Sequence, residues 1–183
     1  AFTPRMVANM RDRIQAATDQ LLGRVIDQGQ MDLMTDFANP LPITVIAEMM
    51  GVPEADHEKF HRWSNDIART VDLTEDDSVY ERGRIAAAAL TDYLSGLTAE
   101  RRKNPQDDLI TALVEVEEAG EKLNEAEMFA TCALLLVAGN ETTINLSGNG
   151  TLALLRHPEA LQQLRDDPGL IQTAVEEMLR YDS

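Results

Sequence analysis

The segment 138–143, Ala-Gly-Asn-Glu-Thr-Thr, is the part of the sequence best suited to chemistry. It follows the uncharged run 128–137 and places the acid Glu141 beside the alcohol Thr142, where the pattern predicts a buried helix. A buried carboxylate is costly unless it is paired, hydrogen-bonded or neutralised. A glycine inside a helix costs roughly 1 kcal/mol relative to alanine. Two local rules are broken within three residues, and such conflicts indicate a functional site.

A helical wheel places several residues of this region on one stripe, at alternating four- and three-residue steps. The members of this stripe are Met128, Cys132, Leu135, Gly139, Thr142 and Leu146. We expect Gly139 to leave a dent and the Thr142 hydroxyl to bond the carbonyl of Ala138 or Gly139, which would bend the helix. A dent beside an alcohol and a carboxylate suits a small polar ligand and a proton relay. A helix kink with no ligand explains the same residues equally well.

The elements that must position this segment are predicted to be helices almost throughout, because apolar residues recur at three- and four-residue steps. Proline, glycine and capping residues divide the chain into successive helices. The predicted ranges are 4–25, 43–50, 53–71, 76–102, 107–118, 124–156, a short helix from 158 and a last helix from 168. The helix near 124–156 begins at Asn124 and Glu127, which have the spacing of a capping box. The fold class is therefore all-α, with residues 1–183 forming one domain or part of one.

The composition excludes several functions. A net charge of −16 disfavours nucleic-acid binding and docking on anionic membranes, and it would favour a basic redox or protein partner. The uncharged run is shorter than the ~20 residues of a membrane span. No signal peptide is recognised, and the lone Cys132 rules out an internal disulfide. These observations predict a cytoplasmic protein.

A second motif, His57-Glu58-Lys59-Phe60-His61, matches the H-E-x-x-H signature of zinc proteases. On a helix the two imidazoles would share a face, and Glu58 could activate a metal-bound water. However, Lys59 places a cation inside the motif, and no later segment offers an evident third ligand. Zinc hydrolysis is therefore a remote alternative, and no metal ligand is assigned.

The segment 138–143 in its long apolar helix resembles the oxygen-binding segment of the cytochrome P-450 monooxygenases. The segment 177–180, Glu-Met-Leu-Arg, resembles the E-x-x-R pair that the family carries on a later helix. The order and separation of the two motifs make them far more specific together than either is alone. The segments 1–4 and 41–47 are also similar to soluble bacterial members, so the resemblance spans essentially the whole chain.

The resemblance implies a role for each matching residue. Glu141 and Thr142 would be catalytic, delivering protons to dioxygen, while Ala138 and Gly139 would lie against the haem and leave room for oxygen. Glu177 and Arg180 would form a buried structural ion pair, although Glu176 is a rival partner at i,i+4. The substrate pocket would include Trp63, Ile67 and Leu135, for which a plain core role is equally compatible.

The family's iron ligand, a cysteine thiolate in a late glycine-marked loop, has no counterpart in the sequence. Cys132 lies in an apolar helix without flanking glycines, so we expect a packed core cysteine. The resemblance thus implies the central helical portion of a monooxygenase, inactive when isolated. The complete enzyme would use haem b, dioxygen and a ferredoxin-like electron donor to hydroxylate a small or medium organic substrate. The alternative is a non-enzymatic helical binding or scaffold domain.

Overall fold

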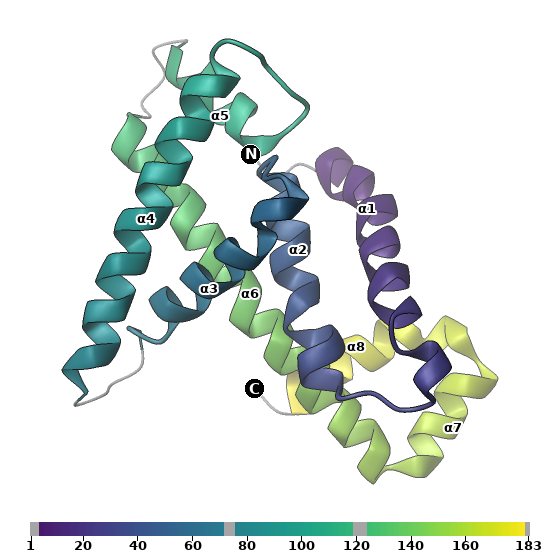
Figure 1. Cartoon of the computed structure of the whole chain (residues 1–183). Coiled ribbons are helices and arrows are strands. Elements are labelled where there is room, and N and C mark those ends of the chain that lie inside the picture. The colour runs from purple at the N-terminus through teal and green to yellow at the C-terminus, as the bar shows by residue number, and fades with distance from the viewer. Residues whose placement is uncertain (1–3, 72–75, 119–123, 182–183) are drawn as a thin grey trace.

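The computed structural model describes residues 4–71, 76–118 and 124–181, and every regular element within these ranges is helical (Figure 1). The all-α class predicted from the sequence is confirmed. The α-helices are α1 (Pro4–Gly23), α2 (Pro40–Met49), α3 (His57–Ala68), α4 (Asp77–Arg101), α5 (Leu109–Glu118), α6 (Glu125–Arg156), α7 (Pro158–Asp166) and α8 (Ile171–Tyr181). Shorter turns are η1 (Ile26–Gln28), η2 (Met34–Ala38), η3 (Glu54–Asp56) and η4 (Pro168–Leu170).

The long helix α6 crosses the middle of the structure and packs against α2, α3, α4, α7 and α8 (Figure 1). It begins at the predicted capping box. The Asn124 side chain accepts a hydrogen bond from the Glu127 amide at 3.0 Å, and the Glu127 carboxylate accepts one from the Asn124 amide at 2.9 Å. The helix continues unbroken to Arg156, so the prediction of one long helix near 124–156 is confirmed.

By length and composition alone, α6 is also the one helix among the described residues that could cross a membrane. Only 17% of its most apolar stretch is buried inside the structure. The sequence prediction counted only the uncharged run 128–137 and so underestimated the length of apolar helix available in α6. Core helices of water-soluble proteins share the same length and composition, so this property assigns no location.

The hydrophobic core lies where α2, α3, α4, α5 and α6 meet. Its fully buried large side chains include Met50, Phe60, Leu94, Ile110, Met128 and Leu136. Trp63 packs on this core in an aromatic cluster, with its ring centroid 5.7 Å from those of Phe60 and Tyr93. The core therefore fixes α3 and α4 beside the middle of α6.

The C-terminus of α2 is held by a buried contact that we call the Arg101 clasp, made by Arg101, Asp108 and Gly51. Arg101 Nε donates to Asp108 Oδ2 at 2.5 Å, and Arg101 Nη2 donates to the Gly51 carbonyl at 2.9 Å. Gly51 has a φ of +74°, and a Cβ there would collide with the Asp108 carboxylate. The clasp joins the ends of α2 and α4 to the start of α5.

The start of α2 differs from the prediction. Pro40 and Pro42 were expected to lie before a helix beginning at Ile43, but both lie in the first turn of α2. The first helical turn has no use for backbone N–H donors, so proline is tolerated there. The preceding turn, η2, is a π-helix in which the Asn39 amide donates to the Met34 carbonyl at 2.9 Å, and it was not predicted.

Candidate functional site

The segment 138–143 lies in the middle of α6, where two threonine hydroxyls bond helix carbonyls. Thr142 Oγ1 donates to the Ala138 carbonyl at 2.7 Å, and Thr143 Oγ1 donates to the Gly139 carbonyl at 3.0 Å. The predicted bond from Thr142 is therefore confirmed. Each carbonyl therefore accepts from a side chain as well as from the backbone. This competition can lengthen the backbone hydrogen bonds of the turn and bend the helix.

The buried stripe of α6 differs from the predicted one. Its buried residues up to the middle of the helix are Met128, Cys132, Leu136 and Asn140, each four residues after the last. The prediction shared Met128 and Cys132 but then followed Leu135 and Gly139, each one residue before a buried position, and Thr142, which is exposed. Four residues slightly exceed one turn of an α-helix, so residues spaced by four shift slowly around its surface. The elements that α6 contacts here are α2, α3 and α4.

Gly139 faces α2, and its missing side chain is compensated by Ile46. A Cβ at Gly139 would lie 3.0 Å from Ile46 Cδ1, which is tighter than ordinary van der Waals contact. The dent predicted at Gly139 exists, but Ile46 fills it. The glycine therefore allows the close approach of α2 and α6.

Glu141 and Thr142 lie side by side on an exposed face of α6, together with Ala138. The expectation that Glu141 is buried is therefore wrong for this chain, because no described element packs over that face. Leu134, one turn earlier, has 65% of its surface exposed. An uncovered leucine next to a small alanine, an acid and an alcohol is typical of a surface that another group covers.

Asn140 is a site residue that the sequence interpretation missed. It is 2% exposed, and its Nδ2 donates to Ser64 Oγ on α3 at 3.1 Å. Ser64 Oγ in turn lies 3.5 Å from the Leu136 carbonyl of α6. Asn140 Oδ1 is buried without a hydrogen-bond partner among the described residues. The sequence feature that could have indicated this role is a polar amide that follows an apolar run and directly precedes Glu141.

Cys132 is buried, with 1% of its surface exposed, and burial raises the pKa of its thiol to about 11. The predicted core role is confirmed. A thiol with such a pKa is protonated at neutral pH and is a poor metal ligand or nucleophile. The described residues therefore provide no thiolate for an iron.

The three residues expected to line a substrate pocket do pack on the core, but not as one group. Trp63 lies in the aromatic cluster with Tyr93, and Leu135 packs against core residues. Ile67 lines a groove between α3, α4 and α6 that includes Phe129 and Ala133. The geometry thus supports the plain core role for Trp63 and leaves Ile67 beside an open groove.

Glu177 and Arg180 on α8 form the predicted pair, in preference to Glu176. Arg180 Nη2 donates to Glu177 Oε1 at 2.6 Å and Nε donates to Oε2 at 2.8 Å. These hydrogen bonds lower the pKa of Glu177 and raise that of Arg180. The side chains are 60% and 71% exposed, so the expected burial of the pair is wrong for this chain. Glu177 lines the edge of a groove between α6, α7 and α8, which leaves the pair open to solvent.

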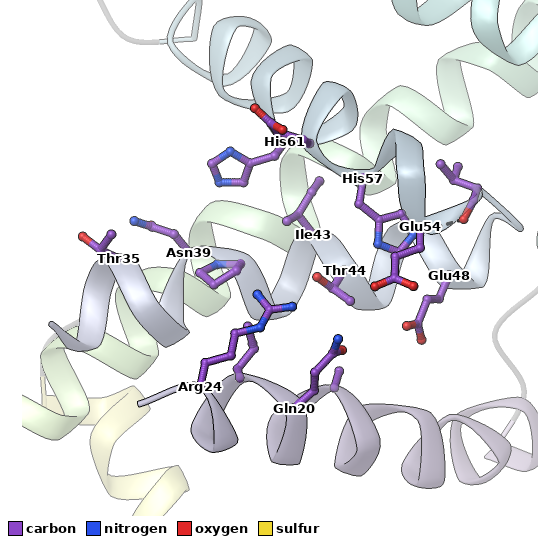
Figure 2. Close-up of a pocket in the computed structure, with 15 residues that line it drawn as sticks. Gln20, Arg24, Thr35, Asn39, Ile43, Thr44, Glu48, Glu54, His57 and His61 are labelled. Atoms are coloured by element: carbon purple, nitrogen blue, oxygen red, sulfur yellow. Dashed lines mark hydrogen bonds between the residues drawn. The ribbon is translucent and has the colours of Figure 1, made fainter. Parts of the chain in front are cut away.

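The H-E-x-x-H motif lines a groove between α1, α2 and α3 (Figure 2). His57 Nε2 donates to the Val52 carbonyl at 3.0 Å, which occupies that ring nitrogen. Within the described ranges, no group of three or more His, Cys, Asp or Glu side chains could hold a metal ion. The geometry therefore gives zinc hydrolysis no support.

Comparison with known proteins agrees with the arrangement around α6. A family model described as Cytochrome P450 matches residues 7–178, and the chain therefore belongs to the cytochrome P450 family. It is 46% identical to cytochrome P450 107B1 of Saccharopolyspora erythraea over 183 residues, which are 100% of this chain and 44% of that protein. The chain thus spans less than half the length of this relative.

Solved structures give the same result. P450BioI, in complex with hexadec-9Z-enoic acid ligated acyl carrier protein, superposes with a TM-score of 0.93 at 42% identity, covering 100% of this chain and 47% of that one. The myxobacterial cytochrome P450 CYP267B1, in complex with myristic acid, gives 0.89 at 44% identity, covering 98% and 44%. The predicted fold, the central helical portion of a cytochrome P450, is confirmed.

The residues present fit one face of a haem. Ala138 is small and exposed, and the apolar Leu134 beside it is left uncovered. A flat apolar macrocycle would need such a surface, and the buried Cys132 would not supply a thiolate to its iron. Ala138 would therefore contact the haem, with Thr142 one turn further along the same face.

Proposed function

We propose that the whole protein is a haem-thiolate monooxygenase that hydroxylates a small or medium organic molecule. The observation that carries this proposal is the exposed acid–alcohol pair Glu141–Thr142, one turn from Ala138 on the uncovered face of α6. Haem with a thiolate ligand supplies the activation of dioxygen. The chain itself would be an inactive part of the haem domain, which agrees with its covering less than half of its relatives.

The role proposed for Thr142 is to hold a proton at Oγ1 near the haem face. Its hydroxyl now donates to the Ala138 carbonyl at 2.7 Å, so its oxygen lone pairs remain available to accept a hydrogen bond. Turning the hydroxyl away from that carbonyl would allow it to donate toward a bound ligand. Glu141, adjacent and exposed, would return the proton from solvent.

The proposed partners are a ferredoxin-like electron donor and a substrate with an apolar chain. The substrate proposal is supported by the relatives that hold myristic acid and an acyl carrier protein carrying hexadec-9Z-enoic acid. The structure of P450BioI with an acyl carrier protein also suggests that a carrier protein could present the substrate. A cytoplasmic location is proposed from the single buried thiol, which suits a reducing compartment.

The test uses the whole protein with a surrogate ferredoxin, its reductase and myristic acid. We expect stoichiometric haem and hydroxylated product from the wild type. Thr142→Ala should retain haem but divert electrons to hydrogen peroxide, because proton delivery fails. Thr143→Ala is the matched control, since it loses the same type of helix bond. Tightly coupled turnover in Thr142→Ala would contradict the relay, and a whole protein without haem would favour the scaffold alternative.

A further inference from the structure

A groove of about 630 Å³ lies between α1, α2 and the start of α3 (Figure 2). All of its lining residues lie between positions 17 and 61, so it is separate from the site on α6. Its floor is apolar and made by the buried residues Ala17, Leu21, Ile43 and Val52. Its walls are polar, which is typical of a groove that binds a ligand with both an aliphatic body and charged groups.

Several polar side chains of the walls have no partner within the described chain. The guanidinium of Arg24, the amide of Asn39 and the carboxylates of Glu48 and Glu54 make no hydrogen bond or ion pair with any described residue. Asn39 and Glu48 are also half-buried. Partly buried polar groups normally find partners, so Asn39 and Glu48 are the stronger indication of a ligand, while the exposed Arg24 and Glu54 are also free to bind one.

The groove is electrically polarised along α2. Asn39 precedes the first residue of α2 and Glu48 lies in its last turn, so they are separated by about 14 Å of helix. Figure 2 shows Arg24 and Asn39 toward one end, and Glu48 and Glu54 toward the other. The positive end of the α2 dipole adds to the positive potential of Arg24, and the negative end adds to the negative potential of the two carboxylates.

The histidines in the wall leave this polarity intact. His57 donates its Nε2 hydrogen to the Val52 carbonyl, so this ring nitrogen is already used within the chain. Burial lowers the pKa of His61, so its ring is neutral at pH 7. Glu58 adds a further carboxylate to the lining. Carboxylates therefore outnumber the single guanidinium, and a ligand's ammonium group contributes more to binding than its anionic group.

We propose that this groove binds an elongated zwitterion, such as an ω-amino acid or a short peptide. Its ammonium group lies between Glu48 and Glu54, and its carboxylate lies at Arg24 and Asn39. Its aliphatic chain covers Leu21 and Ile43 of the floor. The π-helical turn η2, which ends immediately before Asn39, supports this assignment because such turns are rare and occur frequently at functional sites.

The test is calorimetric titration of the whole protein with 6-aminohexanoate. Two derivatives of 6-aminohexanoate each lack one charge: N-acetyl-6-aminohexanoate has no ammonium group, and 6-aminohexanamide has no carboxylate. We expect saturable 1:1 binding of 6-aminohexanoate, weaker binding of the amide and the weakest binding of the acetylated probe. No saturable binding, or equal binding of all three probes, would overturn the proposal.

Variants locate the site. Arg24→Gln and Glu48→Gln should each weaken 6-aminohexanoate binding by at least about fivefold, because a charged hydrogen bond is lost. Arg11→Gln on α1 and Glu115→Gln on α5 remove the same charges from exposed positions outside the groove, and they should leave the affinity within about twofold. Equal losses in groove and control variants would show nonspecific electrostatic attraction and reject the groove. Unchanged melting temperatures exclude misfolding as the cause.

Discussion

The Arg101–Asp108 and Glu177–Arg180 pairs have hydrogen bonds of similar length, 2.5 to 2.8 Å, in very different surroundings. The first pair joins the end of α4 to the start of α5 and has side chains only 8% and 4% exposed, whereas the second lies within one helix turn and is 60–71% exposed. The sequence interpretation selected the second as the buried structural pair and did not notice the first. Hydrogen-bond geometry alone therefore does not show which charges hold a fold together.

The largest effect is expected at the Arg101 clasp. Arg101→Met leaves the Asp108 carboxylate and the Gly51 carbonyl without their buried partner, which should destabilise the whole protein by about 3–5 kcal/mol. Urea unfolding measures this loss. The double variant Arg101→Met/Asp108→Leu should recover part of it, because no buried charge remains uncompensated. A midpoint unchanged in Arg101→Met would show that burial does not separate the two pairs.

A smaller loss is expected at the buried contact between Asn140 and Ser64. Ser64→Ala removes the acceptor of the Asn140 amide and should destabilise the protein by about 1–3 kcal/mol. Asn140→Leu, combined with Ser64→Ala, completes a double-mutant cycle measured by urea unfolding. We expect non-additive losses, whereas additive losses would mean that the two side chains do not interact.

Two glycine substitutions should change stability in opposite directions. Gly51→Ala forces a side chain into a left-handed conformation and against Asp108, which should cost at least about 1–2 kcal/mol. Gly96→Ala, inside α4 with open space around it, should stabilise by about 0.5–1 kcal/mol. Thermal melting compares them, and the same sign for both would contradict the geometry assigned to Gly51.

The smallest effect is expected at the exposed pair. Arg180→Ala removes two hydrogen bonds to Glu177, but water can replace them, so we expect no measurable change in urea unfolding. Glu176→Ala on the same helix is the control. A loss as large as that in Arg101→Met would show that other parts of the whole protein cover the pair.

Local features of the fold were predictable because neighbouring residues determine them. The capping box at Asn124, the length of α6 and the bond from Thr142 to Ala138 each depend on residues three or four positions apart, or on a continuous pattern. The start of α2 was missed because proline both ends helices and begins them. Pro40 and Pro42 begin α2 because η2 ends just before them, and η2 was not predicted.

The candidate site was only partly predictable for a related reason. Ser64 and Asn140 are 76 residues apart in sequence, and nothing local indicates that they meet. The stripe of α6 was placed one residue off because the prediction lacked the positions of α2 and α3. Exposure of Glu141 and Thr142 likewise depends on which elements pack beside α6, and a helical wheel holds no such information.

The aromatic cluster around Trp63 gives the protein a built-in optical probe. Trp63 is the sole tryptophan of the sequence, and its ring contacts those of Phe60 and Tyr93, where α3 meets α4. Its indole is half-buried, so a small shift of either helix changes its contact with water and hence its emission wavelength. Ser64 follows it directly in the chain, so fluorescence at this single position also reports how α3 sits on α6.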